Sequence, residues 1–261
     1  MIRAHFFKSK NNFGDQLVVP VIKWICGEEV KWVGSKVKGK LLCVGSELTR
    51  GVLQENDVVW GYGAKYQKDV VVPNNATILA TRGHITASLL QNVEDPGVYG
   101  DPALLIPKAY KVHEGMEKFY NIGVIPHFTD AKYFEGVKHP KAKVFNILDD
   151  KYKIIRDMHK CKVILSTSLH GCIVAETYGI PVVWIRTAGC IVGGFEMKWN
   201  DYFSGTGRKE QKPYQLPDPI TLKSLGEAKF KTLPKPVFDT SKFEKVWRDF
   251  YNSPEIDKIR E

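Results

Sequence analysis

The sequence predicts an α/β protein made of two Rossmann-like units, each with a parallel sheet, that face a common cleft. Short apolar runs recur along the chain, and most of them end in a glycine-containing or hydroxyl-rich turn. Segments with a helical pattern alternate with these runs, and βα alternation favours parallel sheets. The runs form two sets on either side of Pro107-Lys108. We therefore expect an amino-terminal unit at 1–110 and a carboxy-terminal unit at 111–261, the second ending in a helical extension.

The first unit begins with an apolar run that leads into a turn and a helix. Strands are expected at 2–7, 41–44, 58–60 and 77–80, and helices at 15–26 and 85–92. Asp15 stands where an N-cap is expected. Asp101, directly before Pro102, is expected to fix a turn with its side chain.

The second unit repeats this pattern. Strands are expected at 121–125, 144–147, 163–165 and 182–185, and helices at 152–159 and 171–178. Gly179 is placed to end the second of these helices. Beyond about residue 205 prolines prevent long helices, and only 241–251 regains a helical period, with a Ser241/Glu244 capping box. We expect this last helix to strap the two units together.

Composition limits the possible locations and cofactors. With 261 residues and 43% apolar content the chain can form ordinary cores. It has no run of about 18 apolar residues and no visible secretory signal, so we expect it in the cytoplasm, with the inner face of the membrane as an open alternative. The five cysteines are odd in number and widely spaced, which favours buried free thiols over disulfides. We expect no metal site.

The net charge of +9 is compatible with nucleic acid, an anionic membrane surface or a phosphorylated substrate. The basic residues are scattered among acids, and no nucleic-acid-binding motif accompanies them, so we expect no nucleic-acid partner. A basic cluster at Lys138, His139, Lys141 and Lys143 could contact anionic headgroups. A solvated basic face is the interpretation we favour for it.

The segment 163–184 is the strongest candidate for the active centre. It is predicted to contain a buried strand, a hydroxyl-rich turn, a histidine, a short helix and a second strand. Ser166, Thr167, Ser168 and His170 then lie where the first strand leads into the helix. Ligands of open α/β sheets bind at this edge, and a helix amino terminus favours anions. The segment therefore predicts a site for an anionic small molecule, with His170 as an acid or base and Gly171 allowing close approach.

The same segment resembles the signature Ser-x-Arg/Ser-Leu-His-Gly-x-x-x-Ala of the polysaccharide pyruvyl transferase family. Further pieces that resemble this family are Asn12-Phe13-Gly14-Asp15, Tyr99-Gly100-Asp101-Pro102-Ala103-Leu104-Leu105, Ile125-Pro126-His127-Phe128-Thr129-Asp130 and Lys198-Trp199-Asn200-Asp201. Together they extend over most of residues 1 to 205. The resemblance implies transfer of a pyruvyl group from phosphoenolpyruvate to a polymeric or lipid-linked sugar as a ketal. It also implies a GT-B-like fold, with phosphoenolpyruvate as co-substrate and no metal or redox cofactor.

The candidate residues fall into three groups. His170 is the candidate catalytic acid or base. The candidates for donor binding are Arg82, His127, Ser166, Thr167, Ser168, Gly171 and Arg186, and those for acceptor binding are Asn12, Gly14 and Asp15. Arg82 resembles the arginine that this family shows in an Arg-Gly turn, and a guanidinium suits carboxylate or phosphate. Relatives often carry arginine where this chain has Ser168, so a cation must come from elsewhere.

Structural explanations remain open for several candidates. Either arginine could pair with a structural acid, the hydroxyls could cap the helix, and His127 could bond turn backbone. Two other functions also remain open. One is a metal-independent GT-B glycosyltransferase using a nucleotide sugar, since the chain has no Asp-x-Asp motif. The other is a non-catalytic sugar- or anion-binding protein.

Overall fold

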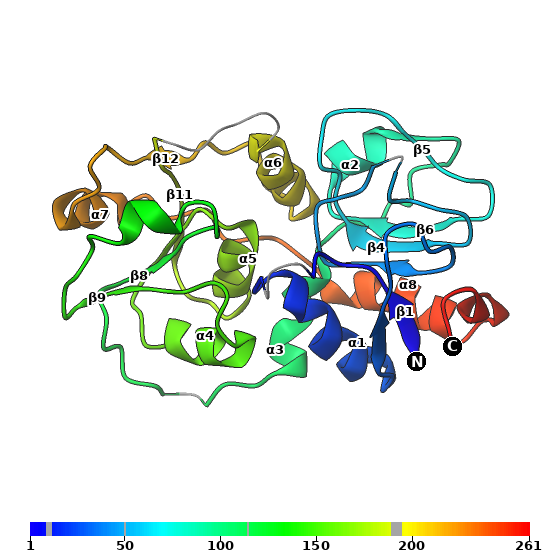
Figure 1. Ribbon diagram of the computed structural model, residues 1–261, viewed down its shortest axis with the longest axis horizontal. Coiled ribbons are helices and arrows are strands. Elements are labelled where there is room, and N and C mark those ends of the chain that lie inside the picture. Colours follow the sequence, from blue (N-terminus) through cyan, green and yellow to red (C-terminus); the bar gives the residue numbers. More distant parts are fainter. Residues whose placement is uncertain (9–11, 50, 114, 189–194) are drawn as a thin grey trace.

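The computed structural model describes residues 1–8, 12–49, 51–113, 115–188 and 195–261. Figure 1 shows two α/β units side by side, the first mostly blue and cyan, the second green to orange. Each unit contains a five-stranded sheet. All strand pairs in both sheets are parallel. The prediction of an α/β fold with Rossmann-like parallel sheets is therefore confirmed.

The first sheet has the order β2-β1-β3-β4-β6. Its strands are β2 (Val30–Trp32), β1 (Ile2–Ala4), β3 (Leu41–Leu42), β4 (Val58–Tyr62) and β6 (Thr77–Thr81), and β5 (Val70–Val71) pairs with β7 (Leu90–Gln91) in a small separate ladder. The helix expected at 85–92 is only α2 (His84–Ser88), because the chain turns there into β7.

The second sheet has the order β12-β11-β10-β8-β9. Its strands are β12 (Tyr214–Gln215), β11 (Val182–Arg186), β10 (Ile164–Ser166), β8 (Ile122–Ile125) and β9 (Ala142–Val144). When each sheet's strands are counted in chain order, both sheets have the doubly wound order 2-1-3-4-5. The chain direction across the sheet reverses between β1 and β3 in one unit and between β8 and β10 in the other. Such reversal points are where open α/β sheets bind ligands.

The helices differ from expectation mainly at their starts. They are η1 (Asp15–Leu17), α1 (Val18–Cys26), η2 (Pro102–Leu105), α3 (Ile106–Ala109), η3 (Ala131–Phe134), α4 (Lys151–Met158), α5 (Leu169–Thr177), α6 (Phe195–Gly205), α7 (Leu222–Ala228), α8 (Thr240–Tyr251) and η4 (Pro254–Lys258). Asp15 does not cap its helix, because Gly14 occupies the N-cap position and Asp15 is the first helical residue. Helix α7, which was not expected, begins at a Thr221/Ser224 capping box. Helix α8 is capped by Asp239 and not by the expected Ser241/Glu244 box.

The carboxy-terminal helices return to the first unit. Trp60 of β4 stacks on Phe243 and Trp247 of α8, with ring centroids 4.8 and 4.9 Å apart, and its indole N–H donates to the Phe243 carbonyl at 3.1 Å. The backbone N–H of Arg3 donates to the carbonyl of Ile259. In Figure 1 α8 accordingly lies beside α1, and the two termini are neighbours. The helix expected to strap the units is thus part of the first unit's core, while the division near residue 110 stays a prediction.

Helix α5 lies at the junction of the two units. All its residues from 169 to 175 are buried, because it lies between its own sheet and η2 of the first unit. The Thr177 hydroxyl donates to the Leu104 carbonyl at 2.8 Å, and Gly179, with φ of 70°, follows the helix as predicted. One apolar cluster includes residues from both units. Helix α5 is therefore held against the first unit.

Two further observations concern the described residues alone. The cysteines among them, Cys26, Cys43, Cys161 and Cys172, are free thiols, and Cys190 lies outside this part of the chain. None of the helices that the structure describes combines the length and the apolar character needed to cross a bilayer.

Candidate functional site

A cavity of about 400 Å³ opens between the two units. Its lining residues are Phe7, Asn12, Asp15, Gly45, Ser46, Glu47, Lys65, Tyr66, His127, Phe128, Ser168, Leu169, His170 and Lys198. Most of them follow the carboxyl ends of four strands, namely β1, β3, β8 and β10. These are the strands that flank the two reversal points, so the ligand-binding edges of both sheets meet in one cavity.

His170 is clamped between two segments of the first unit. Its Nε2 lies 3.5 Å from Oδ2 of Asp101, and within the described part of the chain neither buried atom has a hydrogen bond. On the other side of the ring, a Cβ added to Gly14 would lie 2.1 Å from Nδ1. Gly14 has ordinary helical dihedrals, so the position requires space and not an unusual backbone. His170 and the Asn12–Asp15 turn, which were separate groups of candidates in the sequence, are therefore neighbours in the structure.

Asp15 lines the cavity beside His170 and is almost fully buried. Burial raises its pKa to about 6, although the charge of His170 and a hydrogen bond donated by the Asn12 amide act in the opposite direction. Asp15 can therefore exchange a proton within the physiological pH range.

His127 also lines the cavity, at the end of β8. Its backbone N–H donates to Oγ1 of Thr167 at 2.8 Å, and its Nδ1 lies 2.8 Å from Oγ1 of Thr129. Burial, together with the positive charges of Lys198 and His170, lowers the pKa of its imidazole to about 4. The ring is therefore neutral at pH 7 and can bind ligand oxygens without adding charge.

The hydroxyl-rich turn is used mainly for structure. Ser166 is fully buried, and its Oγ lies 2.7 and 2.9 Å from the carbonyl oxygens of Ile125 and Ser168. Thr167 holds the backbone of His127. A Cβ on Gly171 would lie 2.5 Å from Oγ of Ser166, which explains the glycine. Of the three hydroxyl residues only Ser168 lines the cavity, and it makes no cap hydrogen bond.

Arg82 does not line the cavity. It is fully buried, its Nε donates to Asp201 of α6 at 3.0 Å, and one terminal nitrogen donates to the hydroxyl of Ser46. The other terminal nitrogen, Nη2, is buried with no partner among the described residues. Asp201 also accepts hydrogen bonds from the backbone N–H and the hydroxyl of Thr86. Arg82 therefore ties α6 to the first unit and stands behind Ser46, which does line the cavity.

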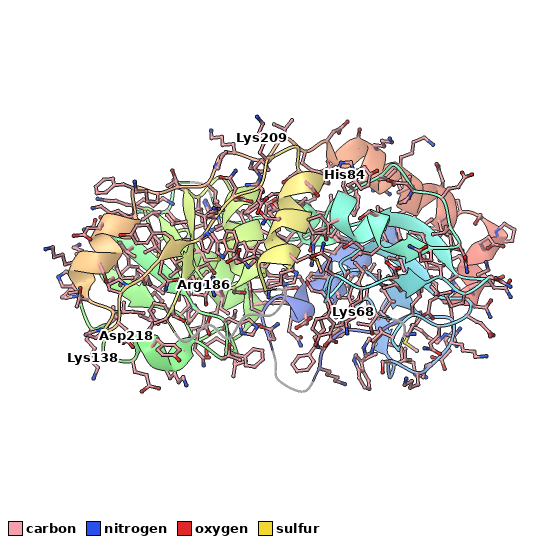
Figure 2. The ribbon with its side chains drawn as sticks, turned by 90° about the horizontal axis from the view of Figure 1, so that it is seen from above. Lys68, His84, Lys138, Arg186, Lys209 and Asp218 are labelled. Carbon is pink, nitrogen blue, oxygen red and sulfur yellow. The ribbon has the colours of Figure 1, made fainter. Side chains whose placement is uncertain are left out.

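Arg186 also pairs with an acid. Its Nη1 lies 2.7 Å from Oε1 of Glu196, and it is not part of the cavity lining. Figure 2 shows Arg186 within the second unit, at the end of β11. The structural pairing left open for both arginines is therefore what the structure contains.

Lysines supply the positive charge of the cavity. Lys65 follows β4 and pairs with Glu47 at 3.5 Å, and Lys198 lies in α6, three residues before Asp201. Arg82 and Arg186, the cations expected in place of an arginine at position 168, do not line the cavity, whereas these two lysines do. The sequence offered a signal for Lys198 in the Lys-Trp-x-Asp element, whereas Lys65 was missed.

From the sequence, Asp101 was expected only to fix a turn with its side chain. Its Oδ1 does accept from the backbone N–H of Ala103 at 2.9 Å, which caps η2. Its Oδ2 faces His170, a second contact that no pattern in the sequence indicated.

The basic cluster lies far from the cavity. Lys143 and Lys160 pair with Asp157, and Lys153 pairs with Asp149. Lys138 lies at the end of the second unit away from the first (Figure 2). Across the described ranges no group of three histidine, cysteine or carboxylate side chains is arranged to hold a metal ion.

Two curated proteins resemble this chain. An uncharacterized protein, L143, of Acanthamoeba polyphaga mimivirus is 34% identical over 122 residues, which are 44% of this chain and 42% of that protein. The succinoglycan biosynthesis protein ExoV of Rhizobium meliloti is 24% identical over 221 residues, 79% of this chain and 65% of that protein. The chain thus spans less than two thirds of the length of either relative.

A family model also matches the chain. The model for polysaccharide pyruvyl transferase matches residues 62–189. This range contains Arg82, Asp101, His127 and the His170 segment, whereas Asn12 to Asp15 lie before it. The resemblance drawn from the sequence is therefore confirmed: over residues 62–189 the chain carries the sequence pattern of the polysaccharide pyruvyl transferase family.

Proposed function

We propose that the chain is a pyruvyl transferase that moves the pyruvyl group of phosphoenolpyruvate onto a sugar of a cell-surface polysaccharide, or of its lipid-linked precursor, as a ketal. The observation that carries the proposal is the position of His170. It lies in the family-matched segment, in the first turn of a helix, and lines a cavity that also contains two lysines. A helix amino terminus with nearby cations suits a donor that carries both carboxylate and phosphate.

The reaction requires balanced proton transfers. A proton adds to C3 of phosphoenolpyruvate, and C2 becomes electrophilic and accepts one sugar hydroxyl. Phosphate then leaves, and a second hydroxyl closes the ketal. Of the two protons released by the hydroxyls, one replaces the proton taken up by C3 and the other leaves with phosphate. A group that donates and a group that accepts protons are therefore needed at one place.

The cavity offers residues for these roles. His170 and Asp15 lie next to each other, and the raised pKa of Asp15 suits proton exchange near neutral pH. We assign His170 to the donor side and Asp15, with Asn12, to the acceptor hydroxyls. Lys65 and Lys198 supply the positive charge for phosphate and carboxylate.

The other candidates act less directly. Ser168 and His127 offer hydrogen bonds to the donor, and Arg82 acts through Ser46, whose hydroxyl it holds. Thr167 and Ser166 shape the turn. Gly14 provides space for the imidazole. Arg186 stays in the proposal as a donor residue only if its pair with Glu196 opens.

The proposal includes a GT-B-like architecture, which two parallel sheets facing one cavity support. Activity needs no metal or redox cofactor. The location is the cytoplasm, where phosphoenolpyruvate is available and where the Lys138 cluster can approach an anionic membrane surface. Lys143 of this cluster, and Lys153 further along the chain, already pair with acids, which limits that contact.

Calorimetric binding of phosphoenolpyruvate, UDP and GDP tests the function. We expect saturable phosphoenolpyruvate binding that weakens in His170→Ala and is unchanged in His139→Ala, a matched variant of an exposed histidine outside the cavity. Binding of the nucleotides alone would favour the glycosyltransferase instead. If phosphoenolpyruvate binds but no sugar acceptor ever turns over, the chain is a binding protein.

A further inference from the structure

The carboxylate of Asp101 is buried in a way that its capping role does not explain. Its Oδ1 caps η2, but its Oδ2 is also inaccessible and has no hydrogen bond within the described ranges. A buried carboxylate oxygen without a donor is costly. His170 Nε2, equally buried and equally without a hydrogen bond, lies 3.5 Å away. Because neither atom has another partner among the described residues, the two are each other's natural partners.

We propose that Asp101 is the positioning residue of His170. It accepts a hydrogen bond from Nε2–H and thereby fixes the neutral imidazole in the tautomer that is protonated on Nε2. The unprotonated Nδ1 is then the nitrogen on the Gly14 side, next to the Asn12–Asp15 turn, whose residues Asn12 and Asp15 line the cavity. The inference rests on the proposed function only in that His170 is taken to transfer protons there.

The surroundings of the ring support this assignment. The titratable groups that face His170 are Asp15 and His127, which line the cavity, and Asp101, which does not. Ligand and water therefore reach the first two, whereas Asp101 contacts the ring from the closed side. The packing of η2 on α5, through the bond from Thr177 to Leu104, holds Asp101 and His170 in register.

This arrangement allows proton transfer without movement of the ring. When Nδ1 takes up a proton, Nε2–H stays on Asp101, whose negative charge stabilises the imidazolium. When Nδ1 releases the proton, the ring returns to the same tautomer. In serine proteases, replacement of the corresponding aspartate by asparagine selects the wrong tautomer and lowers turnover about 10⁴-fold.

The test is the ¹⁵N NMR spectrum of the histidine side chains, with His170 assigned by comparison with His170→Gln. In the wild type we expect Nε2–H and an unprotonated Nδ1. Asp101→Asn keeps a capping oxygen, but its amide can donate to Nε2. In most molecules of this variant His170 should therefore change to the tautomer that is protonated on Nδ1. Asp101→Ser keeps an N-cap hydroxyl that is too short to reach the ring, and should give mixed tautomers. Asp150→Asn, a change in another capping aspartate at α4, should leave the spectrum unchanged.

A wild-type ring protonated on Nδ1, or equal spectra for the wild type and whichever Asp101 variants fold, would overturn the proposal. Phosphoenolpyruvate affinity should stay within about threefold in Asp101→Asn, because Asp101 is outside the cavity lining, while turnover should fall on the order of 10²- to 10⁴-fold. If phosphoenolpyruvate does not bind to the wild type, the proposed function fails, and the tautomer result still decides the role of Asp101.

Discussion

Gly14→Ala gives the sharpest test of the site geometry. A Cβ at this position would lie 2.1 Å from Nδ1 and 2.5 Å from Cγ of His170, whereas ordinary contact begins near 3.4 Å. The imidazole must therefore move by about 1.3 Å. A misplacement of about 1 Å in a catalytic group can cost on the order of 10²-fold in rate. One methyl group should thus displace His170 without removing any functional atom.

The effect on stability follows from two opposing contributions. The backbone of Gly14, at φ −61° and ψ −49°, accepts alanine, which stabilises by about 0.5–1 kcal/mol through the unfolded chain. Overpacking against the ring costs about 1–3 kcal/mol. We expect a net loss of up to about 2.5 kcal/mol in the free energy of unfolding.

Urea unfolding measures this loss in Gly14→Ala, Gly226→Ala, His170→Ala and the double variant Gly14→Ala/His170→Ala. Gly226→Ala in α7, where an added Cβ meets nothing within 4 Å, is the matched control and should gain about 0.5–1 kcal/mol. In a His170→Ala background Gly14→Ala should cost less, although not nothing, because Cβ of residue 170 remains 2.8 Å away. If Gly14→Ala is as stable as Gly226→Ala and binds phosphoenolpyruvate like the wild type, the close approach of the glycine and the ring is refuted.

Three further predictions concern stability. Arg82→Met leaves its buried carboxylate partner on α6 unpaired and should cost about 3–5 kcal/mol in urea unfolding; a loss below about 1 kcal/mol would contradict the ion pair. Asp15, with its pKa raised to about 6, binds its proton more tightly in the folded state, so its contribution to stability falls as the pH rises from about 4 to 6. His127, with its pKa lowered to about 4, binds its proton more weakly in the folded state, so its contribution rises as the pH rises from about 4 to 6.5. Relative to the wild type, the melting temperature should therefore rise more steeply with pH over this window in Asp15→Asn and less steeply in His127→Gln, and profiles parallel to that of the wild type would refute the assignment. Ser166→Ala should cost about 1–3 kcal/mol and Ser168→Ala less than about 0.5 kcal/mol, as measured by denaturation; equal losses would show that the turn is used differently.

The sequence predicted the central elements of the second unit well. β10, α5 and β11 are buried apolar or small-residue segments with a glycine after the helix, and their pattern depends little on the rest of the chain. The edge strands β2 and β12 were missed, because they have three and two residues and no buried run. Short exposed strands depend on their neighbours for pairing and leave no periodic signal.

The site was predictable to the extent that it follows strand ends. Asn12, Asp15, His127 and His170 come together because each follows a strand beside a reversal point, which is a rule of topology. Asp101 reaches the same place through the packing of η2 on α5, which no local pattern encodes. The pairing of Arg82 with Asp201 likewise depends on where α6 lies against the first unit.

The return of α8 to the first sheet also affects the order in which the protein can fold as it is synthesised. Trp60 leaves the ribosome early, but Phe243 and Trp247, between which its ring is stacked, are made near the end of the chain. Arg3 of β1 likewise gains the carbonyl acceptor of its backbone N–H only after Ile259 has been made. The second unit has all its strands by residue 215 and can become compact first, although amino-terminal units usually lead during synthesis. A nascent chain halted before α8 would expose the Trp60 face of its first sheet, and transiently exposed apolar surface of this kind is prone to aggregate.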